Sequence, residues 1–264
     1  MIVSMFRTAR RPPVSAAIIC YNEEANIARC LDALGWCEEI VVVDSGSTDE
    51  TLAIVGSRAG TRTLHRRFDT YVKQKNYALD HCTHDWVLSL DADEVLTPQL
   101  IEEINGLPFD AAGYLIAIRP FLGSQEIKYG TWNPGYKLRL FRRSYGRWGG
   151  SSPHERVVLQ GRTQRLKNRI LHYSYRDRQE FLERNRQYTR MMVEFLAERG
   201  RQTYYGEPVV HWCGNFLKSY LLRRGFLDGR AGLFLAYHIA NFSFMKYSLL
   251  AERNGQERRR PDAA

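Results

Sequence analysis

Residues 86–94 read WVLSLDADE, a short and almost continuously apolar run that ends abruptly in three carboxylates. Such a run is typical of a strand that is buried on both faces of a sheet. Thr97 and Pro98 follow, and this pair is a common way to begin a helix. The stretch therefore predicts a buried strand, an acidic loop at its carboxyl end and then a helix.

Two earlier segments have the same arrangement. Residues 14–20 (VSAAIIC) and 40–43 (IVVV) are apolar runs, and each is followed by polar residues and then by apolar residues at helical spacing. The polar residues at these two ends are Tyr21, Asn22, Glu23 and Asp44. Strands that alternate with helices predict an α/β fold with a mostly parallel sheet flanked by helices. Ligands bind such sheets beyond the carboxyl ends of the strands, where these acids would repel one another unless a positive group lies among them.

Composition limits the class of protein. The chain has 264 residues, of which 44% are apolar and 25% charged, as in an ordinary globular protein with one α/β domain and an appendage or with two small domains. Its five cysteines form no CxxC pair, so they indicate neither a disulfide scaffold nor a zinc cluster and fit a reducing cytoplasm. Residues 1–13 lack the apolar run of a secretory signal and are expected to form a basic tail.

Positive charge is concentrated in the second part of the chain. Residues 1–155 carry 17 Lys and Arg against 19 Asp and Glu, whereas residues 156–264 carry 21 against 10. Helices are expected over 178–199, 212–224 and 233–250, and the last falls short of the roughly 20 apolar residues that a membrane span needs. Basic, aromatic-rich helices suit an anionic membrane surface, although ordinary packing on the core is the alternative. No known motif points to nucleic acid.

Asp91 and Asp93 are the strongest candidates for chemistry. Two carboxylates separated by one residue can share Mg²⁺ or Mn²⁺ with the oxygens of a diphosphate, although an isolated pair is more often a turn or a helix cap. Asp44, at the end of a neighbouring strand, can accept hydrogen bonds from a nucleobase or ribose. The chain has no GxGxxG after the first strand and no GxxxxGK[ST], which argues against a dinucleotide-binding enzyme and a P-loop protein.

Three blocks of the chain resemble the signature blocks of family 2 glycosyltransferases, which have the GT-A fold. They are VSAAIICYNEEANIARCL (14–31), EEIVVVDSGSTDET (38–51) and DWVLSLDADEVLTPQL (85–100). The later KLRLFRR (137–143) and PHER (153–156) are similar to the bacterial branch that adds glucose, in a β-1,4 linkage, to the inner core of lipopolysaccharide. The resemblance implies a catalytic domain over 14–175. Residues 176–264 would then form a helical region that lies on a membrane surface or binds the acceptor.

The resemblance also implies where the nucleotide binds. Tyr21, Asn22 and Glu23 would border it, and Asp44 would bond the uracil or ribose. Lys75 stands where the family usually has arginine before asparagine, so it would contact the base or a phosphate. Lysine keeps the charge of arginine but lacks its two-pronged hydrogen bonding.

Catalytic roles follow from the same resemblance. Asp91 and Asp93 would hold the metal on the diphosphate, with His172 as a further ligand, and Glu155 would be the general base. The candidates for contact with the donor phosphates or an anionic acceptor are Lys137, Arg139, Arg142 and His154. Strand alternation places Lys137 and Arg139 on one face.

The resulting prediction is an inverting, metal-dependent transfer of a hexose, glucose from UDP-glucose, to a lipid-linked saccharide at the cytoplasmic face of the inner membrane. A sugar nucleotidyltransferase is one alternative, but such enzymes hold triphosphate with a glycine-rich loop, and CYNEEANIARC (20–30) contains no glycine. The second alternative is a catalytically inactive membrane or assembly scaffold with a glycosyltransferase fold.

Overall fold

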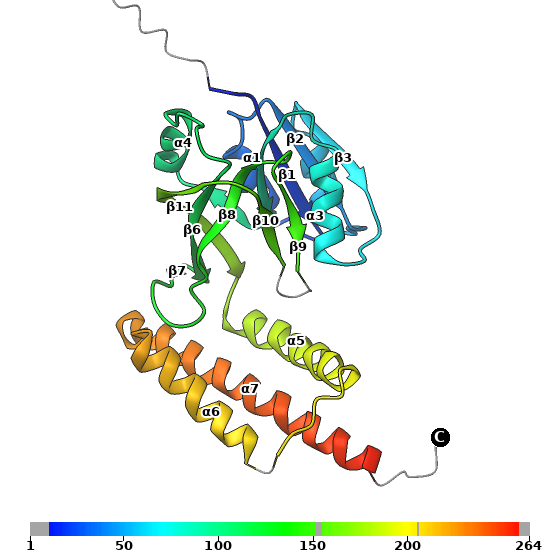
Figure 1. The fold of residues 1–264 in the computed structure, drawn as a ribbon, viewed down its shortest axis with the longest axis vertical. Helices are drawn as coiled ribbons and strands as arrows, with labels where there is room; N and C mark the ends of the chain where they lie inside the picture. Colours follow the sequence, from blue (N-terminus) through cyan, green and yellow to red (C-terminus); the bar gives the residue numbers. More distant parts are fainter. Residues whose placement is uncertain (1–10, 151–154, 205, 259–264) are drawn as a thin grey trace, which may run out of the picture. The chain divides into compact units, whose positions relative to one another are not determined.

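The computed structural model describes residues 11–150, 155–204 and 206–258. The chain divides into two compact units, which are described separately. The first comprises Met1–Ile118 and Gly135–His172, and the second comprises Arg119–Pro134 and Tyr173–Ala264. The first is built on a sheet and the second is mainly helical (Figure 1).

The sheet of the first unit has a parallel half in the order β3-β2-β1-β4. Its strands are β1 (Val14–Cys20), β2 (Glu39–Asp44), β3 (Thr61–His65) and β4 (Trp86–Asp91). Cys20 is paired with Asp44, and Ile19 with Asp91, so the three acidic loops leave the sheet at the same edge. The predicted α/β fold, with parallel strands that end together, is confirmed.

Helices cover both faces of this parallel half. Alternate residues of each strand point to opposite faces: Ile18 and Leu88 pack with α1, α2 and α4, whereas Ala17 and Val87 pack with α3. The helices are α1 (Ile27–Asp32), α2 (Thr51–Gly56), α3 (Tyr71–Asp80) and α4 (Pro98–Asn105). Both faces are therefore buried, which explains why the strands are apolar at almost every position.

The other half of the sheet continues through β8, β6, β11 and β5, and its described pairings are antiparallel. These strands are β8 (Gly135–Arg142), β6 (Gly113–Leu122), β11 (Thr163–Tyr175) and β5 (Glu94–Leu96). Tyr114 pairs with Leu140 but Leu115 pairs with Leu138, so Arg139 is an extra residue in β8. Because this bulge interrupts the alternation, the expectation that Lys137 and Arg139 share a face is wrong: Lys137 is exposed and Arg139 is buried.

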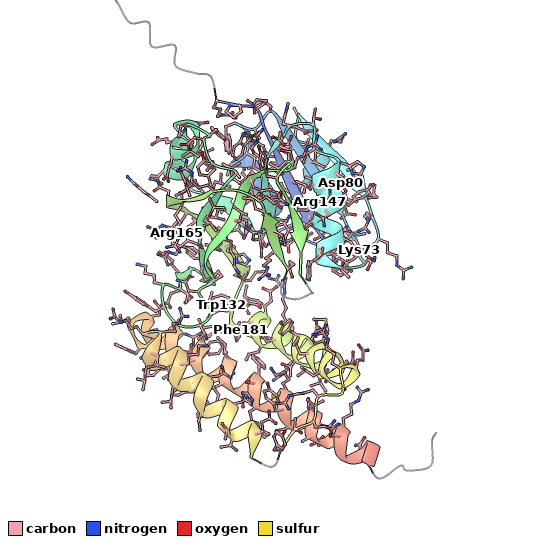
Figure 2. The ribbon with its side chains drawn as sticks, in the orientation of Figure 1. Lys73, Asp80, Trp132, Arg147, Arg165 and Phe181 are labelled. Atoms are coloured by element: carbon pink, nitrogen blue, oxygen red, sulfur yellow. The ribbon has the colours of Figure 1, made fainter. Side chains whose placement is uncertain are left out.

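A short hairpin lies against α3. It consists of β9 (Gly146–Gly149) and β10 (Arg156–Leu159). Asn76 of α3 accepts a hydrogen bond from the backbone of Trp148 and donates one to it, at 3.0 and 2.8 Å. Arg147 pairs with Asp80 of α3 at 2.8 Å, and their side chains lie side by side in Figure 2. These contacts fix the hairpin on the helix.

The second unit contains the three helices expected from the sequence, with shifted bounds. They are α5 (Arg178–Glu198), α6 (Glu207–Leu217) and α7 (Gly229–Arg258), and two short turns, η1 (Lys218–Leu222) and η2 (Gly225–Asp228), join α6 to α7. Among the described residues, no helix is both long enough and apolar enough to cross a membrane.

Residues 119–134, which the sequence analysis assigned to the catalytic domain, group with this second unit. They include β7 (Gln125–Glu126), which pairs with the end of β6. The backbone N–H groups of Lys128 and Tyr129 donate to the carboxylate of Asp228, and Trp132 packs edge-on against Phe181 (Figure 2). The segment belongs to the helical unit because its buried polar and aromatic partners lie there.

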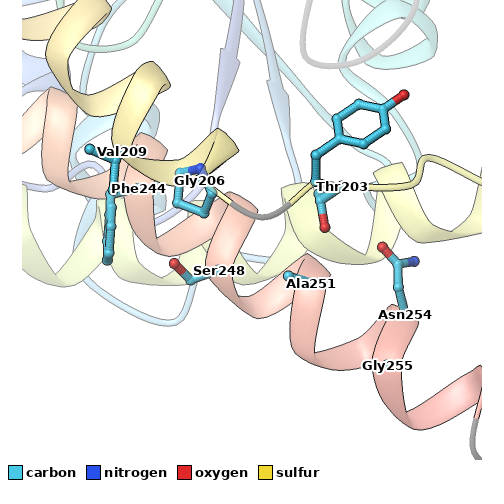
Figure 3. A pocket seen from close by; sticks show the side chains of 10 residues that line it. Thr203, Gly206, Val209, Phe244, Ser248, Ala251, Asn254 and Gly255 are labelled. Atoms are coloured by element: carbon cyan, nitrogen blue, oxygen red, sulfur yellow. The ribbon is translucent and has the colours of Figure 1, made fainter.

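A pocket of about 530 Å³ lies between the segment that precedes α6 and the last turns of α7 (Figure 3). Its walls are largely apolar and include Val209, Phe244 and Ala251. Thr203 and Asn254 each place a buried side-chain oxygen there that has no hydrogen-bond partner among the described residues. None of the residues predicted to act in catalysis lines this pocket.

The start of α7 tolerates no side chain at Gly232, because an added Cβ would overlap the carbonyl oxygen of Gly225. We expect Gly232→Ala to lower the free energy of unfolding by about 1–3 kcal/mol, the usual range for overpacking. Gly255→Ala, in the same helix but with open space around it, is the matched control and should be neutral or stabilising by up to about 1 kcal/mol. Urea unfolding followed by circular dichroism measures both, and equal stability of the two variants would contradict the close packing.

Candidate active site

The carboxylate of Asp91, at the end of β4, lies between two cations. Lys75 Nζ is 2.8 Å from Asp91 Oδ1, and Arg139 Nη2 is 3.1 Å from Oδ2. Lys75 comes from α3 and Arg139 from the bulge in β8, and both side chains are buried. Burial opposes ionisation of Asp91, yet the two cations hold the pKa of its carboxyl far below the usual value. The protein thus supplies the positive charge that the clustered acids require.

Glu94 completes this cluster and was missed by the sequence analysis, although it is the third acid of DADE. Its side chain is fully buried, with Oε1 2.5 Å from Arg139 and Oε2 accepting a hydrogen bond from the backbone N–H of Asp91. Burial raises the pKa of the Glu94 carboxyl, although the guanidinium opposes this shift. Burial also acts against the charge of Arg139, but Glu94 and Asp91 raise its pKa above the ordinary value. Arg139 therefore stays charged and bridges the two carboxylates.

Asp93 and His172 meet although they are 79 positions apart in the chain. His172 lies opposite Glu94 where β11 pairs with β5, and its Nε2 is 3.1 Å from Asp93 Oδ2. Burial alone would lower the pKa of His172, but Asp93, with Glu94 and Asp91, raises it to about 9. The structure thus brings together two of the three residues predicted to bind metal.

The third predicted ligand, Asp91, faces its two cations instead. In the part of the chain that the structure describes, no group of three or more His, Cys, Asp or Glu side chains is arranged to hold a metal ion. Neighbouring ligands at right angles around Mg²⁺ lie about 3 Å apart, because each is about 2.1 Å from the ion. The contact between Asp93 and His172 has that spacing, but it is an ion pair whose proton the ring would have to lose before the two side chains could bind a divalent cation. Asp91 would join it by giving up a contact with Lys75 or Arg139.

The loops after β1 and β2 are tied together where the nucleotide is predicted to bind. Asp44 is fully buried and accepts hydrogen bonds from Gly46 N (2.8 Å) and Ser47 Oγ (2.5 Å). Burial opposes its ionisation, but these bonds hold the pKa of its carboxyl below the ordinary value. The Asn22 side chain accepts a hydrogen bond from Thr48 N, and its own backbone N–H donates to Ser47. A nucleoside that bonds to Asp44 would therefore have to replace hydrogen bonds that Asp44 accepts from its own loop.

The two remaining residues of this group differ in exposure. Tyr21 is exposed at the end of β1, and Glu23 is tied to α2 through its backbone N–H, which donates to Thr51 Oγ1 at 2.7 Å. Asn22, between them, has a positive φ of 52°, a conformation that asparagine tolerates better than most residues.

Trp148 of the β9–β10 hairpin is a second residue that the sequence analysis missed. Its ring centroid lies 4.4 Å from Lys75 Nζ and 5.9 Å from the Arg139 guanidinium carbon, so it covers both cations of the Asp91 cluster. Its indole N–H is buried and has no hydrogen-bond partner among the described residues. A tryptophan in a glycine-rich turn carries no sequence signal for such a role, because the contact with α3 is long-range.

Glu155 lies just before β10, two residues ahead of Val157, which pairs with Trp148. Its Oε2 is buried and has no hydrogen-bond partner in the described part of the chain. An unpaired buried carboxylate oxygen is costly unless something binds to it. His154 lies outside the described residues.

Two other candidates lie apart from the cluster. Arg142 pairs with Asp85 at 2.7 Å, and because Asp85 precedes β4, this pair lies at the opposite end of that strand from Asp91. Lys137 is exposed on β8. Of the three basic candidates that the structure describes, Arg139 is the one that lies beside Asp91.

Removing the charge of Arg139 should destabilise the protein strongly. Arg139→Met would leave Glu94 buried without its partner, and we expect a loss of about 3–5 kcal/mol in the free energy of unfolding. Arg142→Met, three residues along the same strand, breaks an ion pair that water reaches and should cost less than about 1 kcal/mol. Urea unfolding of both variants tests this, and similar losses would show that the buried cluster is not a special determinant of stability.

Comparison with known proteins identifies the family of the chain. The family model described as Glycosyl transferase family 2 matches residues 15–161. The lipopolysaccharide core biosynthesis glycosyltransferase LpsC of Rhizobium meliloti is 30% identical over 262 residues, which cover 92% of this chain and 96% of that protein. An uncharacterized glycosyltransferase of Rickettsia typhi, RT0209, is 27% identical and covers 90% of this chain and 87% of its own length.

A solved structure is similar in fold. Mannosyltransferase PcManGT from Pyrobaculum calidifontis, in complex with GDP-Man and Mn²⁺, aligns with a TM-score of 0.53 at 16% identity, over 92% of this chain and 88% of that one. The predicted GT-A fold and the family resemblance are confirmed. With the family model matching more than half of its length, the chain belongs to glycosyl transferase family 2.

Proposed function

We propose that this glycosyltransferase moves a hexose, glucose from UDP-glucose, with inversion to a lipid-linked saccharide of the lipopolysaccharide core. The observation that carries the proposal is the contact of Asp93, in the loop after β4, with His172 of β11, because both are predicted metal ligands. Similarity to LpsC, whose name places it in lipopolysaccharide core biosynthesis, supports the acceptor class. An acceptor of this kind implies that the enzyme acts at the cytoplasmic face of the inner membrane.

Donor binding would use the acidic edge of the sheet. Tyr21, Asn22 and Glu23 would border the nucleoside, and Asp44 would bond its uracil or ribose. Lys75 and Arg139 lie at the site where the diphosphate is expected, and their positive charge supports binding of its oxygens. Lys137, Arg142 and His154 would be left for more distant contacts with an anionic acceptor.

Mg²⁺ or Mn²⁺ fits the donor set of Asp93 and His172, with Asp91 as a third ligand. When bound, such an ion stabilises the negative charge that develops on the departing nucleoside diphosphate. The oxygen and nitrogen donors of this set suit a divalent cation of this kind. PcManGT, which shares the fold, was crystallised with Mn²⁺ and a nucleotide sugar.

Glu155 would be the general base. Its carboxylate takes the proton of the acceptor hydroxyl while that oxygen bonds to the anomeric carbon and the bond from this carbon to the diphosphate breaks. Attack from the face opposite the leaving group inverts the anomeric centre. The unpartnered Oε2 supports this role, because a carboxylate that accepts a substrate proton needs an oxygen lone pair that no other donor occupies.

Nucleotide binding should depend on a divalent cation. We expect calorimetric titration to give tight binding of UDP or UDP-glucose with Mn²⁺, and binding weaker by roughly 10–100-fold with EDTA or in Asp93→Ala. GDP-mannose and ADP-heptose should bind more weakly than the uridine nucleotides. Asp85→Ala removes a carboxylate from the opposite end of β4 and should bind like the unmodified protein. Folded protein that binds none of these nucleotides would favour the inactive scaffold.

Glu155→Gln should abolish transfer but not donor binding. We expect kcat to fall by roughly 10²–10⁴, the usual contribution of a general base, with the Kd for UDP unchanged. The assay measures release of UDP from UDP-glucose in the presence of lipopolysaccharide that lacks its outer sugars. Glu103→Gln alters a carboxylate that instead accepts backbone hydrogen bonds from Lys167 and Asn168, and it should retain full kcat. Equal activity of the two variants would assign the base to another residue.

A further inference from the structure

Helix α6 and the turn η1 expose their apolar side chains. Val210, Leu217 and Leu221 recur at helical spacing, and all three are exposed, Val210 to 70%. Leu222 is 80% exposed, and no residue of α6 is fully buried. An apolar stripe at helical spacing normally faces the core of a protein, so this stripe faces the wrong way for a helix that is surrounded by water.

The less exposed side of the same helix combines aromatic packing, in which Trp212 meets Phe216 and, in α7, Tyr237, with polar contacts. His211 stacks on the ring of Tyr247 in α7, and Asn215 donates a hydrogen bond to Ser243 of α7 at 3.0 Å. Ser219 is buried and accepts a hydrogen bond from Thr131 N. These contacts hold α6 and η1 in their orientation, because rotating the helix to bury its leucines would break them.

The exposed apolar surface continues past η1. Phe226 and Leu227 of η2 are about half exposed, as is Leu233 in α7. We call the apolar face the set Val210, Leu217, Leu221, Leu222, Phe226 and Leu227. Six large apolar side chains are thus exposed within eighteen residues of the chain, and contiguous apolar surface of this kind marks sites of interaction.

Every exposed charge along this segment is positive. Lys218, Arg223, Arg224 and Arg230 are exposed, and in the described part of the chain no ion pair joins them to a carboxylate. The sole acid between residues 208 and 250, Asp228, is buried and accepts backbone hydrogen bonds from Lys128 and Tyr129. The apolar face therefore has a cationic border without compensating negative charge.

We propose that the apolar face docks into the headgroup region of an anionic phospholipid bilayer. The leucine and phenylalanine side chains would enter the boundary between headgroups and acyl chains, and the cationic border would lie against the lipid phosphates. A second copy of this chain fits less well, because it would bring two cationic borders together. The inference rests on the proposed function for its purpose, because docking would give the enzyme access to a lipid-linked acceptor. The contact with lipid itself requires neither the donor nor the acceptor sugar.

The test is co-sedimentation of the full chain with vesicles of phosphatidylglycerol and phosphatidylethanolamine, without nucleotide. We expect binding at low salt that weakens at least tenfold in 0.5 M salt and is weak on pure phosphatidylcholine. Leu217→Glu/Leu222→Glu should lose at least tenfold in affinity. The matched control, Tyr188→Glu/Met191→Glu, introduces the same charges at exposed apolar positions of α5 and should bind normally.

A charge-reversal pair tests the border separately. Lys218→Glu/Arg223→Glu should abolish the preference for anionic vesicles, whereas Arg186→Glu/Arg190→Glu on α5 should retain it. Absence of vesicle binding by folded protein at low salt overturns the proposal. An equal loss of vesicle affinity in Leu217→Glu/Leu222→Glu and in its control Tyr188→Glu/Met191→Glu also overturns it. A dimer in sedimentation velocity that Leu217→Glu/Leu222→Glu converts to monomer overturns it in favour of a second copy. Titration of UDP into the same variants keeps a failure of docking distinct from a failure of donor binding.

Discussion

The rest of the active site depends on the buried ion cluster of Arg139 with Asp91 and Glu94. A charge that is removed from water must be paired. Here the Arg139 guanidinium pairs with both carboxylates, and Lys75 pairs with that of Asp91. The members come from α3, β4, β5 and β8, so the cluster joins elements that are distant in sequence. Because Asp91 and Glu94 are both held, the two residues between them have little freedom. Asp93 is thereby presented to His172 on β11.

Much of the fold could be predicted because its strongest signals are local. Apolar runs identified the parallel strands, and the acids after them marked the edge of the sheet where the site lies. The position of Arg139 could not be predicted, since it depends on how β8 pairs with β6 and not on alternation within β8. Trp148 was missed for the same kind of reason. The sequence GRWGG (146–150) does not indicate that Asn76 of α3 will form hydrogen bonds with the backbone of Trp148. Glu94 directly follows the DxD pair in the sequence. Its role could not be predicted, because the sequence does not show that this third acid is buried.

Lysine at position 75 is consistent with both a structural and a ligand-binding role. An ammonium group has three N–H donors, and Asp91 Oδ1 uses one of them. The ring of Trp148 covers the group on another side without using a donor, because a cation and an aromatic face attract electrostatically. A compact charge held in this way can turn its remaining donors toward an arriving phosphate. Arginine at this position would offer a flat, two-pronged group, whose contact with Asp91 would fix the direction of every donor.

The chain passes between the two units three times, through β6, before β8 and through β11. Within the helical unit, the leucines of α6 are exposed although the helix itself is packed against α7. Their exposure is maintained by polar contacts on the opposite side of the helix, between Asn215 and Ser243 and between Ser219 and Thr131. Such an arrangement lowers stability in water, since apolar surface stays hydrated. It becomes favourable only where that surface leaves water, which is the condition at a bilayer surface, and the adjacent lysine and arginine side chains would select for anionic lipid there.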